Sequence, residues 1–306
     1  MRQIALRTCL TLVAVALACC PARAAEGEAP HQYCNTNIPP DEATGFVPLP
    51  EGDVFCPLLA DPKDPHSFIS YVRGTSTSPL GTDLLSVGIG DQFGIGRWNG
   101  YHAGDGFQIG LEGAVFAQFD LNTQSYDLIN ADYTVGFPMT YRFGAFSGRA
   151  RVYHQSSHLG DEFVLRSRIP RENFSFEAAE VILSFDLGPA RVYAGGEYLI
   201  HELPQDLEDW VLHGGLELRQ RNGALRLGNV ASARFIAAGD VKSVQDLDWE
   251  VAVSGVAGIE FSRPRESGHA ARVWSLLGHY YYGPSPYGQF FRSDVSYYGI
   301  GLHFSL

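Results

Sequence analysis

The stretch from residue 106 to residue 122, GFQIGLEGAVFAQFDLN, alternates apolar and polar side chains with a period of two. Apolar or small side chains occupy its odd positions, which are Phe107, Ile109, Leu111, Gly113, Val115, Ala117, Phe119 and Leu121. Its even positions include Gln108, Glu112, Gln118, Asp120 and Asn122. This period is typical of a β-strand with one apolar and one polar face. The stretch also exceeds the roughly 9–11 residues that a tilted strand needs to cross a bilayer.

The same pattern recurs to the end of the chain and predicts twelve strands. They lie at about 67–74, 84–97, 106–120, 131–143, 146–157, 174–187, 190–201, 211–220, 224–237, 248–262, 271–283 and 295–306. Connections alternate between short turns and long polar loops, and an even strand count puts both termini of the barrel on the same side of the membrane. We therefore expect an all-β fold, a closed antiparallel transmembrane β-barrel over residues 67–306, because closure pairs every strand edge in lipid. A soluble lipocalin-like binder is less compatible with the strand count and the terminal strand.

The first 24 residues predict a secretory signal peptide, with Arg2 and Arg7 before an apolar run and Ala22-Arg23-Ala24 at the cleavage site. A lipoprotein acylated at Cys19 or Cys20 is the alternative. Removing residues 1–24 takes away three arginines and no acid, which changes the net charge from −12 to −15. A chain this acidic is a poor partner for nucleic acid.

Residues 25–66 are rich in proline and predict a short irregular periplasmic extension. Cys34 and Cys56 are the two cysteines outside the leader, and in an exported chain they most simply form one disulfide. A metal pair is the alternative, but no second pair of soft ligands lies near them.

A polar island, VYHQSSHLGDEF at residues 152–163, covers the end of the predicted strand 146–157 and the start of the loop after it. Arg149 and Arg151 in the middle of that strand are unsuited to hydrocarbon, so we expect the odd positions to face the lumen. His154 and Ser156 then lie on the lipid-facing side, at the outer rim. Two positions on one strand face are within reach of each other, so the imidazole could accept the hydroxyl proton.

The HQSS segment resembles the His-x-Ser centre of outer-membrane phospholipase A, itself a twelve-stranded barrel, and that of lipid A deacylases. This resemblance implies His154 as general base and Ser156 as nucleophile. The third residue of the phospholipase, an asparagine, could correspond to Asn173, while Asp161 or Glu162 could also orient the imidazole.

Simpler interpretations compete with each of these sites. His154 and Ser156 could bind headgroups or loop backbone, and Asp161 and Glu162 could be solvated acids rather than calcium ligands. In the lumen, Glu112, Arg149, Arg151, Glu180 and Glu197 could pair across a narrow barrel or form a track for anions. We favour the paired network.

A wider resemblance covers most of the mature chain, from FQIGLEGAVFAQFD through YDLINADY, YHQSSHLGDEF and YAGGEYL to LHGGLE. It is to an uncharacterised family of Gram-negative envelope proteins described only as a domain of unknown function. The ending YYGIGLHFSL also resembles the C-terminal signal read by the barrel-assembly machinery, with Leu306 where phenylalanine is commoner.

The leading functional prediction is a non-enzymatic outer-membrane barrel, either a narrow solute pathway or a surface interaction protein. It carries no cofactor, reaches the Gram-negative outer membrane after Sec export, and contacts outer-membrane lipids and lipopolysaccharide. The alternative is a lipid esterase or deacylase that uses His154 and Ser156, with calcium as a possible cofactor. The oligomeric state is not predicted.

Overall fold

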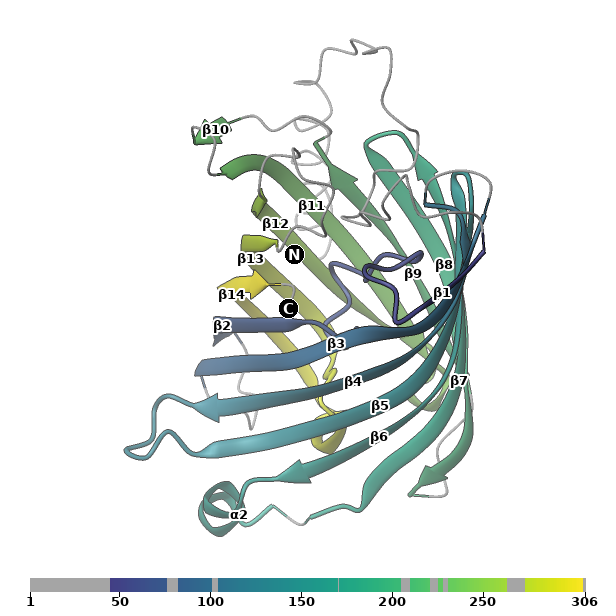
Figure 1. Cartoon of the computed structure of the whole chain (residues 1–306). Helices are drawn as coiled ribbons and strands as arrows, with labels where there is room; N and C mark the ends of the chain where they lie inside the picture. Colours follow the sequence, from purple (N-terminus) through teal and green to yellow (C-terminus); the bar gives the residue numbers. More distant parts are fainter. Residues whose placement is uncertain are drawn as a thin grey trace.

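The computed structural model describes residues 45–75, 82–100, 104–169, 171–204, 210–220, 225–227, 231–262 and 273–304. Almost all of them form one antiparallel sheet that closes into a twelve-stranded barrel (Figure 1). The barrel strands are β2 (Ser67–Gly74), β3 (Asp83–Asn99), β4 (Gly106–Asp120), β5 (Leu128–Phe143), β6 (Phe146–Leu159), β7 (Phe174–Leu187), β8 (Ala190–Leu203), β9 (Trp210–Arg219), β11 (Ala231–Val244), β12 (Glu250–Ser262), β13 (Trp274–Pro284) and β14 (Asp294–Phe304). The fold class predicted from the sequence is confirmed.

Each strand pairs with its neighbours along the chain, and the last strand closes the barrel on the first. In that closing pair, Phe304 of β14 lies opposite Ser67 of β2. Two three-residue strands extend the sheet: β1 (Phe46–Pro48) pairs with the end of β3, and β10 (Leu225–Leu227) pairs with β11. No strand edge of the twelve is left open, as a barrel in lipid requires.

The largest departure from the predicted elements lies in β11, which occupies residues 231–244 where the sequence pattern ended a strand at 237. The sequence predicts Gly239 and Asp240 in a loop. In the structure Asp240 points into the lumen and accepts hydrogen bonds from Tyr193 and His213. The loop before β7 also contains a short helix, α2 (Asp161–Ser167). Connections do not alternate strictly, because residues 220–230 and 263–273 join strands at the end that carries the two-residue turns.

The two faces of the barrel follow the predicted alternation. Along β4 the odd positions are exposed or partly exposed, and the even positions, including Gln108, Glu112 and Gln118, are buried. The large side chains that face outward are almost all apolar or aromatic, as on the lipid-facing surface of a membrane barrel.

Residues 46–48 extend the barrel wall as β1, and most of residues 49–66, part of the segment predicted to be a periplasmic extension, lie inside the barrel (Figure 1, purple). We call residues 49–66 the lumen segment. Val54, Phe55 and Leu58 are at most 2% exposed. Backbone groups of the segment are bound by lumen side chains: Arg142 donates to the Val54 carbonyl over 2.8 Å, and Glu217 accepts from the Leu59 amide over 2.8 Å.

Two glycines of β3 let the N-terminal residues pass this close to the strand. A Cβ added at Gly94 would lie 2.7 Å from Pro50, and one at Gly96 would lie 2.7 Å from the Phe46 ring. Any larger residue would push these residues off the barrel wall, so the glycines serve close packing.

The predicted signal peptide and Cys34 lie outside the described residues, so the Cys34–Cys56 disulfide stays a prediction. Cys56 itself is fully buried in the lumen segment. Within the described residues, no helix combines the length and the apolar composition needed to span a membrane.

Candidate functional site

The polar island on β6 divides between two faces of the barrel. Tyr153, Gln155 and Ser157 are buried in the lumen, whereas His154 and Ser156 are partly exposed on the outer face. His154 and Ser156 therefore lie on the outer face of β6, the face expected from the positions of Arg149 and Arg151.

His154 has a carboxylate partner on the neighbouring strand that the sequence did not predict. Glu177 of β7 lies directly opposite His154 in the β6–β7 register, and its Oε1 is 2.7 Å from His154 Nδ1. The second oxygen of Glu177 lies 3.0 Å from Nδ1 of His201 on β8. Because a carboxylate only accepts hydrogen bonds, Glu177 holds the protons of both imidazoles on Nδ1.

This arrangement leaves Nε2 of His154 available to act as a base. Nε2 has no hydrogen-bond partner among the described residues, and Ser156 lies two positions further on the same face. No hydrogen bond joins Ser156 to His154 within the described chain. Such bonds are often long before a substrate binds.

The cluster lies close to the outer edge of the apolar surface. From Phe146, beside the two-residue turn, to His154 the strand rises about 20 Å along the membrane normal, at about 3.3 Å per residue and a tilt near 40°. The apolar band of such barrels is about 25 Å tall. Tyr133 lies opposite Ser156 on β5, and Tyr198 packs on Trp210 with ring centroids 5.0 Å apart. These aromatic side chains are typical of a headgroup boundary.

The other predicted site residues lie apart from this cluster. Asn173 is exposed at the end of the loop before β7, and no hydrogen bond joins it to His154 within the described residues. Asp161 and Glu162 are exposed in the first turn of α2, and Asp161 forms an ion pair with Arg171. Among the described residues no third acid or histidine joins them at metal-binding distance, so a calcium site there stays a prediction.

The five predicted lumen charges are buried and paired. Arg149 binds Glu180 over 2.9 Å, and Arg151 bridges Glu112 at 2.9 Å and Glu180 at 2.6 Å. Glu197 accepts a hydrogen bond from Tyr153 and lies 3.5 Å from Lys242. The lumen segment joins this network through Asp64, which lies 2.7 Å from Arg149.

Two groups of buried residues have the composition of a metal site: Asp61, His213 and Asp240, and Glu180, Glu197 and His213. In the first, His213 Nε2 lies 2.6 Å from Asp240, which also accepts from Tyr193 over 2.5 Å. Ligands of one zinc ion, each about 2.0 Å from it, would stand more than about 3 Å apart. The contacts of the first group are thus those of a hydrogen-bond network.

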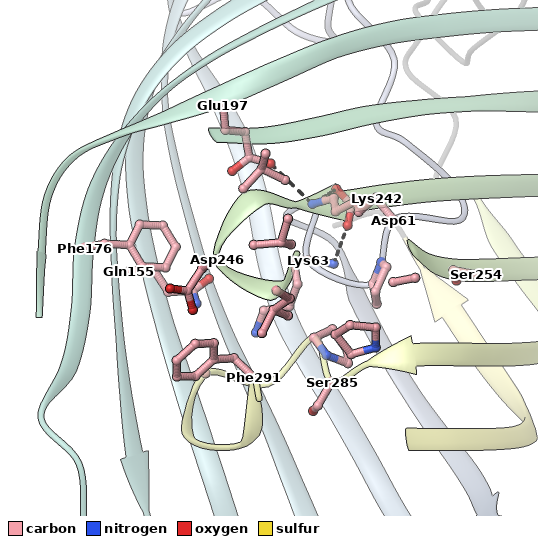
Figure 2. A pocket seen from close by; sticks show the side chains of 18 of the residues that line it. Asp61, Lys63, Gln155, Phe176, Glu197, Lys242, Asp246, Ser254, Ser285 and Phe291 are labelled. Carbon is pink, nitrogen blue, oxygen red and sulfur yellow. Dashed lines mark hydrogen bonds and ion pairs between the residues drawn. The ribbon is translucent and has the colours of Figure 1, made fainter. Parts of the chain in front are cut away.

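A cavity of about 170 Å³ lies between the lumen segment and the loops after β11 and β13 (Figure 2). Its charged lining residues are Asp61, Lys63, Glu197, Asp240, Lys242 and Asp246, and its other walls are largely aromatic and aliphatic. Lys63 and Lys242 are the only lysines of the chain.

A closed twelve-stranded barrel with an apolar outer surface and a charged lumen defines the chain as a barrel of the Gram-negative outer-membrane type. Its sequence belongs to the family described as protein of unknown function (DUF1207), whose model matches residues 19–306. No curated protein matches the chain in sequence.

Solved structures of similar fold include outer membrane phospholipase A from Escherichia coli, with a TM-score of 0.51 and 13% identity over 80% of this chain and 93% of that chain. The phospholipase dimer from Salmonella typhi with bound calcium has a TM-score of 0.50 and 14% identity, over 80% and 94% of the chains. The KdgM porin in complex with oligogalacturonate has a TM-score of 0.41 and 10% identity, over 78% and 99%. At these identities the phospholipases establish a shared fold.

Glu177 is the site residue that sequence reasoning missed. The available signal was the strand register: the outer face of β7 carries Ser175, Glu177 and Ala179, and an acid there is as anomalous as His154 on β6. Finding the pair required knowing which residue of β7 lies opposite His154.

Proposed function

We propose that the chain hydrolyses an ester bond of an outer-membrane lipid, with Ser156 as nucleophile, His154 as general base and Glu177 as the residue that orients the base. The observation that carries the proposal is the 2.7 Å contact of His154 with Glu177, on the lipid-facing surface and two residues from Ser156. An imidazole held by a carboxylate at Nδ1 and free at Nε2 is the arrangement that activates a serine hydroxyl.

The chemistry follows the acyl-transfer sequence. His154 Nε2 accepts the Ser156 proton as Oγ bonds to the ester carbonyl carbon, and the imidazolium then protonates the departing lipid alcohol. Water, deprotonated by the same nitrogen, releases the fatty acid from the acyl-enzyme and restores the serine. Glu177 keeps its charge throughout and stabilises the imidazolium.

The position of the cluster supports a lipid substrate. Ester bonds of phospholipids lie between the headgroups and the acyl chains, at the depth we estimate for His154 and Ser156. A half-exposed histidine and a carboxylate at the edge of an apolar surface also require an explanation, since ionisable groups facing lipid are costly and usually functional.

The similar solved structures give further support. Three of them are phospholipases by name, and one of these, with a TM-score of 0.50, is described as an active-site mutant in which asparagine is replaced by alanine. In our assignment Glu177 takes the orienting role, and Asn173 has none. The same fold is the basis for proposing an outer-membrane location after Sec export, contact with lipopolysaccharide, and assembly through the C-terminal strand.

The test is fatty-acid release from phospholipid or lipid A by the purified protein in detergent. We expect Ser156→Ala to abolish release and labelling by a fluorophosphonate, and Ser175→Ala to retain both. Ser175 is the matched control because it lies opposite Ser156 on β7 and also faces outward. Loss of activity in Ser175→Ala with retention in Ser156→Ala would refute the assignment of the nucleophile. Release of no fatty acid from either lipid class, in a folded protein, would refute the function.

Calcium belongs in the same assay, because one similar phospholipase structure contains it. Asp161 and Glu162 are the proposed ligands, and because they lie apart from His154 and Ser156, a calcium ion there would bind lipid headgroups rather than the ester carbonyl. Chelation and Asp161→Asn should then lower the rate together.

A solute pathway through the barrel is the competing function, and the lumen segment argues against it. Most of residues 49–66 lie in the described lumen and bind its wall, and Arg149 and Arg151 form ion pairs with acids rather than a track for anions. Single-channel steps in planar bilayers that respond to Arg149→Ala or Arg151→Ala would restore this function.

A further inference from the structure

One wall of the lumen cavity is a continuous row of aromatic rings. Tyr153 packs edge to face on Phe176 with centroids 5.8 Å apart, Phe176 packs on Phe174 at 5.8 Å, and Phe174 packs on Phe291 at 5.0 Å. All four rings line the cavity. Phe176 and Phe291 are partly exposed, so the wall begins at solvent and continues into the lumen.

The charges around the cavity are unequal. Four carboxylates line it against two lysines, and both lysines already have partners. Lys63 Nζ is bound by Asp132 and lies over the Phe116 ring, 4.5 Å from its centroid. Lys242 Nζ lies between Asp61 at 3.2 Å and Glu197 at 3.5 Å. The side chains that line the cavity therefore include more carboxylates than ammonium groups.

Two of the carboxylates keep oxygens that accept no hydrogen bond. Oδ2 of Asp246 is buried without an acceptor bond, and its one ion-pair contact in the described chain is Arg292 Nε at 3.8 Å. Oδ2 of Asp61, on a side chain that is 0% exposed, accepts none either, although Lys242 is close. Buried oxygens normally accept a hydrogen bond, so both oxygens can accept from a donor bound in this cavity. Figure 2 shows Asp246, Phe176 and Phe291 among the side chains that line the cavity.

We propose that this cavity binds a small organic cation, a primary or quaternary amine. Aromatic faces next to carboxylates attract such cations through the ring quadrupole and the charge together. At about 170 Å³ the cavity is slightly larger than the roughly 150 Å³ cavity that accommodates benzene. The ammonium group lies against the aromatic wall near Asp246, and its N–H or C–H groups face the unsatisfied oxygens. This site is inside the barrel, so it is independent of the proposed hydrolysis on the outer surface.

The experiment is a calorimetric titration of the full chain in a glucoside detergent with choline, and with its neutral isostere 3,3-dimethyl-1-butanol. We expect choline to bind at least tenfold more tightly than the isostere, because the two differ only in charge. Glycerophosphocholine in a third titration separates the two sources of the amine. Tighter binding of choline indicates a site for free amines, and tighter binding of glycerophosphocholine indicates a site for the lipid headgroup.

Two variants locate the site. Asp246→Asn should raise the Kd for choline at least tenfold, and Phe291→Leu severalfold, whereas Glu250→Gln should leave it unchanged. Glu250 is the matched control because it is an exposed acid near the same loop that does not line the cavity. The proposal would be overturned if choline and the neutral isostere bound equally, or if both cavity variants had an unchanged Kd for choline. It would also be overturned if choline did not bind below about 10 mM, a very weak affinity.

Discussion

The two faces of β6 and β7 carry polar residues under opposite conditions. On the lumen face Arg149, Arg151 and Glu180 are at most 4% exposed, and each is bound by more than one partner. On the outer face the side chains of His154 and Glu177 are 40% and 42% exposed, and the histidine uses one of its two nitrogens. Adjacent residues of one strand therefore lie in these two different environments.

This difference teaches how to separate structural from functional polar groups in a membrane barrel. A buried charge must be saturated by partners, because leaving it unpaired costs several kcal/mol. A group that is to transfer a proton must keep a free position, as His154 Nε2 does. The ion pairs of Arg149, Arg151 and Glu180 in the lumen therefore indicate a structural network, and the free nitrogen of His154 on the outer face indicates a reactive site.

The strongest test of this comparison replaces two adjacent serines by alanine, one on the outer face and one on the lumen face of β6. Ser156→Ala should lower the rate of lipid hydrolysis by at least about 10⁴-fold, because a serine hydrolase without its nucleophile retains only residual catalysis. Ser157→Ala should leave the rate unchanged and lower stability by about 1 kcal/mol, since its hydroxyl donates to Asp132 in the lumen. The measurements are fatty-acid release and urea unfolding in lipid vesicles.

If Ser157→Ala lost activity while Ser156→Ala kept it, the division between the faces would be wrong. Heat-modifiable migration of both variants on gels provides the control that the barrel has assembled.

The second prediction concerns the ion pairs on the lumen face. Arg151→Ala removes the partner of Glu112 and Glu180 and should lower the free energy of unfolding by about 3–5 kcal/mol, the usual cost of breaking a buried ion pair. Hydrolysis by the protein that remains folded should be unchanged. A loss of rate without a loss of stability would show that the lumen network serves the reaction and is not only structural.

Much of the fold could be predicted from the sequence because lipid imposes a strict pattern. Strand period, strand count and the facing of His154 and Ser156 follow from the alternation that a bilayer requires. β11 was the exception, since Asp240 looks like a loop residue until Tyr193 and His213 are known to lie opposite it.

The missing parts depend on contacts between residues far apart in sequence. Glu177 is 23 residues from His154, and no local pattern reports which residue of β7 lies opposite. The lumen segment has no periodicity, so its polar and proline-rich sequence gave no sign that Val54 and Phe55 would be buried. Its fit to the barrel depends on Arg142, Arg149 and Glu217, from three different strands.

The third prediction compares two glutamates on β7 with the same isosteric change. Glu177→Gln should lower kcat by about 10- to 100-fold, because an amide still accepts from Nδ1 but stabilises the imidazolium less. Glu180→Gln, on the lumen face, should leave kcat unchanged and destabilise the barrel, since Arg149 and Arg151 lose their shared charge. Equal kcat in the wild type and Glu177→Gln would exclude Glu177 from the orienting role.

The smallest expected effect tests whether Asp53, near the start of the lumen segment, is charged and paired like the other lumen acids. Burial, followed by the neighbouring carboxylate Asp91, raises the pKa of Asp53 to about 7, although Gln108 and Arg97 act in the opposite direction. An unfolded Asp has a pKa near 3.9, so between about pH 4 and pH 7 the docked segment binds more protons than the undocked one. Docking of residues 49–66 should therefore weaken as the pH rises through this window and stay constant above it. Hydrogen exchange of the segment, corrected for the intrinsic rate, should be severalfold faster at pH 8 than at pH 5, and Asp53→Asn should remove the difference. Slower exchange at pH 8 would mean that Asp53 is charged and paired like the other lumen acids, and the two faces would then differ without exception.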